Sequence, residues 1–190
     1  MVLPLLWKIL YWSWIVTEVL VLLVTRTRRG GGNISDRGSL IVLWLVIFSS
    51  ISLGSWAQEA AGFAAFSDSA PWIRPVALGL LILGLSIRWS AIYTLGRSFS
   101  ANVAIHAMQT LNRSGLFRYM RHPSYTGMVL IFLALGLRSR NWLALAFFVV
   151  PPVAALLYRI HVEEAALTGA FGEQYTDYSR TTKRLVPGIY

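Results

Sequence analysis

The chain has 190 residues, of which 56% are hydrophobic and only 13% are charged, and its formal net charge is +9. Soluble domains usually carry about 25% charged residues, so an ordinary soluble domain is excluded and a single membrane domain over residues 1–190 is expected. The sequence has no cysteine, which excludes disulfides, thiolate metal sites and cysteine nucleophiles.

Hydrophobic segments predict an all-α fold, an integral membrane bundle of about five transmembrane helices, because a helix crosses a bilayer core in about 20 residues. In chain order the segments cover about 3–24, 39–58, 75–95, 124–138 and 141–159. The first lacks a basic leader and a clear cleavage site, so we interpret it as a retained helix. The fourth is short and is expected to form a hairpin with the fifth, with Arg138 to Asn141 as the turn.

Positive charge is concentrated in the first and third loops. The first loop has four arginines against Asp36, and the third, about 96–122, has four arginines and no acid. Because basic loops stay in the cytoplasm, both loops and the C-terminal 30 residues are predicted to be cytoplasmic, with the N-terminus outside. Arg138 and Arg140 in the hairpin turn would then lie outside, against this rule. Residues 1–95 are expected to be supporting spans, and residues 96–190 are expected to hold the cofactor and catalytic region.

Two polar clusters stand beside these spans. His122 and Pro123 precede the fourth segment, where proline is well suited to the first position of a helix. Alone, the dipeptide indicates helix initiation as readily as a ligand pocket lined by imidazole and free N–H groups. Arg159 and Glu163 have i, i+4 spacing at the end of an apolar helix, so they share one face, while Glu164 points elsewhere. They could form a simple ion pair, or bind an anionic and a cationic group of a ligand.

The remaining charged residues suggest structural roles. Arg88 lies deep in the third segment and is expected to extend to the membrane interface, whereas Lys8 and Glu18 are expected to face helix partners or interfaces. The surplus of arginine is better explained by topology and anionic lipid headgroups than by nucleic acid. No pair of histidines has metal-ligand spacing, so no metal is expected.

The C-terminal half resembles the isoprenylcysteine carboxyl methyltransferase family of integral membrane enzymes. The first matching block runs from Leu95 to Arg97 and from Ser114 to Gly127, and contains R-H-P-S-Y-T-G. The second runs from Arg159 to Tyr178, with R-x-x-x-E-E and F-G-x-x-Y-x-x-Y, and ends at Arg184 to Pro187. The order and spacing of both blocks is specific, whereas R-H-P-x-Y alone is shared with phospholipid N-methyltransferases and sterol reductases.

The resemblance implies S-adenosylmethionine as the methyl donor and a lipophilic or prenylated acceptor that carries a carboxylate. By position, Arg159 would face the acceptor, and the cofactor would contact Asn102, Gln109, Thr110, Leu111, Asn112, Phe117, His122, Pro123, Ser124, Tyr125 and Glu163. Family members often have histidine where Gln109 stands and tyrosine where Phe117 stands. Arg159 and Glu163 are therefore the expected catalytic pair, on a cytoplasmic face beside membrane lipids.

Other functions are compatible with the residues themselves. A carboxylate is already ionised and can attack a sulfonium methyl directly, but an amine acceptor would need a general base, for which His161 or Glu164 are candidates. A sterol-type reductase would need a basic NADPH phosphate pocket, and Arg113, Arg118 and Arg121 are candidates for it. A membrane scaffold without activity is the remaining alternative.

Overall fold

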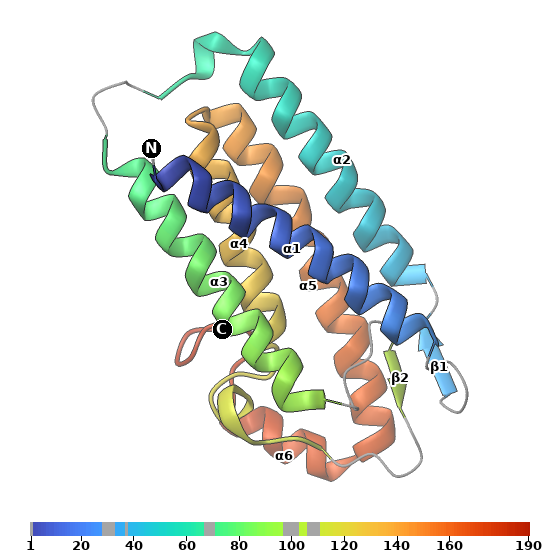
Figure 1. Cartoon of the computed structure of the whole chain (residues 1–190). Coiled ribbons are helices and arrows are strands. Elements are labelled where there is room, and N and C mark those ends of the chain that lie inside the picture. Colours follow the sequence, from blue (N-terminus) through green and yellow to red (C-terminus); the bar gives the residue numbers. More distant parts are fainter. Residues whose placement is uncertain (1, 28–32, 37, 67–70, 97–102, 106–110) are drawn as a thin grey trace.

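The molecule is built from helices that follow the hydrophobic segments of the sequence (Figure 1). A computed structural model describes residues 2–27, 33–36, 38–66, 71–96, 103–105 and 111–190. The elements in chain order are α1 (Val2–Thr27), β1 (Asn33–Asp36), α2 (Gly38–Ala60), η1 (Gly62–Ala64), α3 (Ile73–Leu95), β2 (Val103–Ile105), η3 (Gly115–Arg118), α4 (Pro123–Ser139), α5 (Trp142–Phe171) and α6 (Glu173–Thr181).

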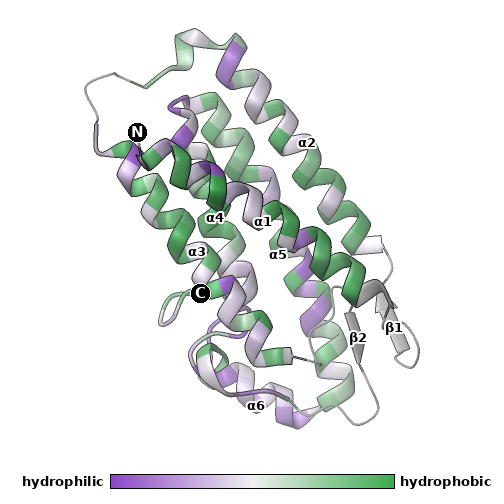
Figure 2. Cartoon of the chain, in the orientation of Figure 1, coloured by the Kyte–Doolittle hydropathy of each residue, from purple (hydrophilic) through white to green (hydrophobic). Residues whose placement is uncertain are grey.

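Helices α1, α2, α3 and α5 are each long and apolar enough to cross a membrane. Hydrophobic residues cover these helices along most of their length, and polar residues gather at the two ends of the bundle (Figure 2). Helix α4 has 17 residues and a length of about 26 Å, somewhat less than the roughly 30 Å of a bilayer core. The predicted all-α membrane bundle is therefore confirmed, with four helices long enough to span the membrane and the shorter α4 packed among them.

The α4–α5 hairpin is closed by a tight turn, as the sequence predicts. Arg140 adopts the left-handed conformation at φ 55°, and Asn141 caps α5 by accepting a hydrogen bond from the Ala144 amide at 2.9 Å. The Asn141 side chain also donates to the Ala61 carbonyl at 2.7 Å. This contact ties the turn to the segment that follows α2, so the second loop and the hairpin turn lie at the same end of the bundle.

A short antiparallel ribbon at the other end adds a small β element to the expected all-α fold. Strand β1 pairs with β2, with Asn33 opposite Ile105 and Ile34 opposite Ala104. Because β1 follows α1 and β2 follows α3, the ribbon holds the first and third loops together on one side of the bundle. This agrees with the charge pattern, which assigns both loops to the same side.

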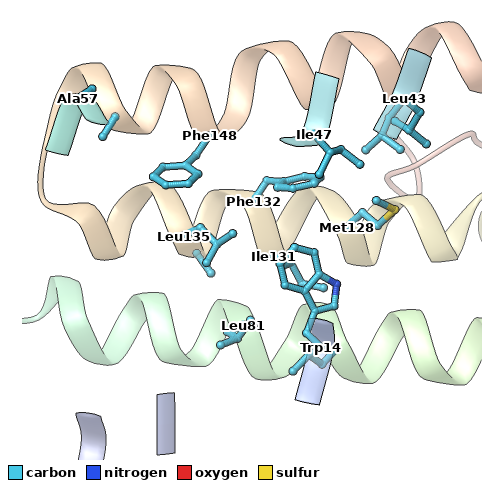
Figure 3. Packing of buried hydrophobic residues seen from close by; sticks show 14 residues of the cluster. Trp14, Leu43, Ile47, Ala57, Leu81, Met128, Ile131, Phe132, Leu135 and Phe148 are labelled. Atoms are coloured by element: carbon cyan, nitrogen blue, oxygen red, sulfur yellow. The ribbon is translucent and has the colours of Figure 1, made fainter. Parts of the chain in front are cut away.

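Helix α4 lies at the centre of the apolar core. Ile131 and Phe132 on α4 are fully buried, and Leu81 of α3 and Ile47 of α2 pack on either side of them (Figure 3). Trp14 of α1 reaches into the same cluster, with its ring 6.0 Å from that of Phe132 in an edge-to-face arrangement. With Phe148 of α5, the core joins the four other long helices around α4.

Helices α3 and α4 approach closely through two glycines. A methyl group on Gly84 would lie 2.8 Å from the Gly127 carbonyl oxygen, and one on Gly127 would lie 2.6 Å from the Gly84 carbonyl oxygen. Small residues at helix contacts are a common means of close packing inside membranes, where dispersion contacts replace the hydrophobic effect.

Arg88 does not extend to the membrane interface, and that expectation is wrong. Its guanidinium is buried and forms an ion pair with Glu18 through both carboxylate oxygens. The Trp14 indole also donates to Glu18, at 3.0 Å. A buried charge is tolerated when an opposite charge and hydrogen bonds satisfy it, and Glu18 supplies both. Of the two environments expected for Glu18, a helix partner or an interface, the structure shows the helix partner.

Candidate functional site

The start of α4 forms the centre of the site. His122 is the residue before the helix and Pro123 is its first residue, as the sequence predicts. The amides of Tyr125 and Thr126 donate to the His122 carbonyl at 3.0 and 3.1 Å, which closes the first turn. The His122 and Tyr125 rings stack, with centroids 5.6 Å apart and planes at 16°. Two flat rings thus stand together at the N-terminal end of a buried helix.

The predicted pair on α5 meets this helix through Tyr125. The Tyr125 hydroxyl donates to Glu163 Oε2 at 2.7 Å and also interacts with the Arg159 side chain. Arg159 and Glu163 therefore share one face of α5, as their spacing predicts. However, they do not stand at the end of the helix, because α5 continues to Phe171 and ends at Gly172, which has φ 52°. The apolar length of a span limits the membrane crossing, not the helix, which continues until a residue breaks it.

Ser39 is a member of this cluster that the sequence did not indicate. Arg159 is buried and its Nη1 donates to the Ser39 hydroxyl, at the start of α2, at 2.5 Å. A serine at a helix start is usually only a cap, and 120 residues separate it from Arg159, so no local signal marks it.

Glu164 has a different environment from its neighbour Glu163. Its Oε1 accepts from Arg121 Nε at 2.8 Å and lies 3.3 Å from His122 Nε2, while its Oε2 accepts from Arg184 Nε at 2.9 Å. Charge-assisted hydrogen bonds of this kind are among the stronger ones in proteins. Glu164 thus joins α5, the segment before α4 and the C-terminal tail, while Glu163 faces Tyr125.

The C-terminal tail packs against the segment before α4. The Arg121 amide donates to the Lys183 carbonyl at 2.7 Å, and the Thr126 hydroxyl donates to the Leu185 carbonyl at 2.7 Å. From α6, the Tyr178 hydroxyl donates to the Phe117 carbonyl at 2.6 Å. Burial raises the pKa of Tyr178 to about 12, so the hydroxyl keeps its proton at neutral pH. The third loop and the tail therefore build one region, as the sequence predicts.

The other predicted cofactor residues fall into three groups. Ser124 lies in the first turn of α4, where its hydroxyl accepts from Arg88 Nη1 at 2.8 Å. The Asn112 side chain donates through Nδ2 to the Thr94 carbonyl at 3.1 Å and accepts through Oδ1 from the Ser114 amide at 2.8 Å. These bonds fix the loop that also holds Leu111 and the buried Phe117. Asn102, Gln109 and Thr110 lie outside the described residues.

Of the residues needed by the alternative functions, Glu164, Arg121 and Arg113 bind other groups, whereas His161 and Arg118 are exposed. His161 is exposed, and Glu164 is held by two arginines, so neither is arranged as a base beside Tyr125. Arg121 binds Glu164, and Arg113 donates to the Gln174 carbonyl and lies over the Tyr178 ring. Within the described part of the chain, no group of three or more metal-ligating side chains occurs.

Comparison with known proteins agrees with this architecture. The sequence profile of the isoprenylcysteine carboxyl methyltransferase family matches residues 77–169, which include α4, Arg159 and Glu163. The chain is therefore similar to this family over about half of its length. It is 29% identical to protein-S-isoprenylcysteine O-methyltransferase A of Arabidopsis thaliana, over 86% of this chain and 83% of that protein. To the protein-S-isoprenylcysteine O-methyltransferase of Schizosaccharomyces pombe it is 34% identical, over 60% of this chain and 49% of that protein.

A solved structure shares the fold of this chain. The structure of a eukaryotic intramembrane Ras methyltransferase, an isoprenylcysteine carboxyl methyltransferase, matches with a TM-score of 0.63 and 25% identity. The match covers 76% of this chain and 52% of that one, so this chain spans about half the length of the solved protein. The chain is a multi-pass integral membrane protein of this fold, and the amine-methylating and reductase alternatives have no support among these relatives.

Proposed function

We propose that the protein transfers the methyl group of S-adenosylmethionine to the carboxylate of a lipophilic, isoprenylcysteine-like acceptor at the membrane. The observation that carries the proposal is the meeting of Glu163, Arg159 and Tyr125 beside the first turn of α4. It places a carboxylate, a guanidinium and an aromatic ring in one cluster, within the region that matches the family.

The residues fit the chemistry of S-adenosylmethionine. The cofactor supplies a sulfonium methyl, and it also carries a cationic amino group and a flat adenine ring. Glu163 is half-buried and can hold the amino group through a charge-assisted hydrogen bond. The stacked His122 and Tyr125 rings offer a flat surface of the kind that an aromatic ligand prefers. Tyr125 donates to Glu163, which fixes the direction of its carboxylate.

Arg159 is the candidate residue for binding the carboxylate of the acceptor. Its planar guanidinium can bind a carboxylate in a fork, and Ser39 and Tyr125 hold the side chain in place. The acceptor carboxylate needs no base, because its oxygen attacks the methyl carbon as the carbon–sulfur bond breaks. The task of the protein is therefore to align oxygen, carbon and sulfur and to exclude water. The prenyl-like tail would remain in the lipid beside the apolar helices.

We also propose that this end of the bundle faces the cytoplasm, where S-adenosylmethionine is available. The first and third loops are joined by the β1–β2 ribbon, and together they carry the basic residues that favour the cytoplasmic side.

Two substitutions test the separate roles of the pair. Glu163→Gln should weaken S-adenosylmethionine binding by about 1–3 kcal/mol, as expected for the loss of a charge-assisted hydrogen bond. Arg159→Lys should leave that affinity nearly unchanged and lower methyl transfer at least roughly tenfold, or about 1.4 kcal/mol, because lysine keeps the charge but loses the fork.

The measurements are calorimetry on the detergent-solubilised protein and turnover of a prenylated thioether carboxylate. Calorimetry with NADPH is the control for the reductase alternative. Unchanged cofactor affinity in folded Glu163→Gln would refute the role of Glu163, and full turnover in Arg159→Lys would reduce Arg159 to a structural partner of its neighbours. Absence of S-adenosylmethionine binding by the unmodified protein would refute the proposed function as a whole.

A further inference from the structure

A buried polar chain leads from α1 to the candidate site. Glu18 on α1 pairs with Arg88 on α3, and Arg88 Nη1 continues to the Ser124 hydroxyl on α4 at 2.8 Å and to the Ser124 carbonyl at 3.5 Å. All three residues are buried, with 6%, 6% and 8% of their surfaces exposed. One guanidinium therefore joins three membrane helices at the first turn of α4.

The backbone geometry fixes where this guanidinium stands. Gly127 lies one turn after Ser124, and a methyl group on it would be 2.8 Å from both the Cβ and the amide nitrogen of Arg88. The α3 backbone therefore touches α4 directly at this level. With the base of its side chain held against α4, Arg88 has little freedom, and its fork is oriented between Glu18 and Ser124.

The partners of Arg88 have unequal roles. Helix α1 is the least buried of the four spanning helices. Only 11% of the residues in its most apolar stretch are buried inside the molecule, against 39% in α3. The carboxylate of Glu18 also accepts from Trp14, whose ring is inserted beside Phe132. Trp14 thus holds the Glu18 carboxylate in place on α1, where it pairs with Arg88. Of this pair, Arg88 makes the hydrogen bond that reaches the candidate site.

We propose that Glu18 and Arg88 are positioning residues for the cofactor-binding face, which they hold in place through Ser124 and the first turn of α4. The first turn of α4 carries His122 and Tyr125, and Tyr125 in turn orients Glu163. A charged pair inside a membrane is costly and is usually kept for function. This inference rests on the proposed function and extends it to two residues on helices that do not contribute to the expected site.

The test compares Arg88→Lys and Glu18→Gln with Lys8→Gln, which removes an exposed charge from the same α1 helix. Full-length protein in detergent is examined by hydrogen exchange of the segment 121–128, by thermal unfolding and by S-adenosylmethionine calorimetry. Both network variants should raise exchange in that segment and weaken cofactor affinity at least about fivefold, while exchange within α5 at 144–152 stays unchanged. Lys8→Gln should leave all three measurements unchanged.

The exchanged pair Glu18→Arg with Arg88→Glu separates positioning from simple helix attachment. It restores the ion pair between α1 and α3, so the thermal midpoint should recover. A carboxylate at position 88 cannot donate to Ser124, and the glutamate side chain is two bonds shorter than that of arginine, so it ends short of the place from which Arg88 Nη1 reaches the Ser124 hydroxyl. Affinity should therefore stay low and exchange at 121–128 should stay high. Recovery of affinity together with the midpoint would overturn the proposal, and so would normal affinity and exchange in folded Arg88→Lys.

If the charge variants do not fold, Ser124→Cys keeps the ion pair and weakens only the acceptor of the Arg88 hydrogen bond. Exchange at 121–128 should still rise, and unchanged exchange would overturn the proposal. The exchange comparison needs no ligand, so it decides the positioning role even if the unmodified protein does not bind S-adenosylmethionine, a result that would refute the proposed function alone.

Discussion

The close contact between α3 and α4 can be tested with two glycines on the same helix. A methyl group on Gly84 would meet the Gly127 carbonyl oxygen at 2.8 Å and Ile131 Cγ1 at 2.9 Å. A methyl group on Gly79 would meet nothing within 4 Å. Both glycines lie inside α3, so replacing either by alanine brings the same gain in helix propensity, about 1 kcal/mol.

The difference between Gly84→Ala and Gly79→Ala therefore reports the packing alone. Backbone atoms cannot move aside as a flexible side chain can, and overpacking of this kind costs about 1–3 kcal/mol. For a chain of this size, 1 kcal/mol corresponds to about 2–4 °C in the thermal midpoint. Gly84→Ala should consequently unfold about 2–12 °C below Gly79→Ala, and Gly79→Ala should equal or exceed the unmodified protein.

The assay is thermal unfolding of the two purified variants in the same detergent, followed by circular dichroism. Cofactor affinity is measured in parallel, because Gly127 lies one turn from Ser124 and a displaced α3 would move Arg88 as well. Equal midpoints for the two variants would refute the close approach of α3 and α4. A thermal midpoint for Gly79→Ala below that of the unmodified protein would show that the gain in helix propensity differs between the two positions.

Two further predictions concern topology and the tail. The chain has no native cysteine, so Phe63→Cys and Arg118→Cys can be labelled one at a time. A membrane-impermeant thiol reagent should reach the two positions from opposite sides of the membrane, with position 118 on the cytoplasmic side. Labelling of both positions from one side would contradict the helix arrangement. Glu164→Gln weakens the contacts with Arg121 and Arg184, so it should loosen the C-terminal tail and speed tryptic cleavage near Lys183 by about tenfold. The control Asp177→Asn removes an exposed ion pair and should not change the cleavage rate. Equal cleavage rates for the two variants would show that backbone contacts attach the tail.

The sequence alone was sufficient for features that depend on near neighbours or on the surrounding solvent. The spans follow from apolar length, because a bilayer requires backbone groups to be satisfied within each helix. The start of α4 follows from Pro123, whose fixed φ suits the first helical position. The common face of Arg159 and Glu163 follows from the helical repeat, and Tyr125 contacts both.

The tertiary structure decided the partners of the charged groups. Arg88 on its own would extend toward water, but it stays buried because the fold brings Glu18 to it across 70 residues of sequence. Ser39 joins Arg159 across 120 residues, and Glu164 is enclosed by arginines from the third loop and from the tail. Such pairings depend on which helices lie side by side. That arrangement is fixed by long-range packing, such as the contact of Gly84 with Gly127, which no local pattern encodes.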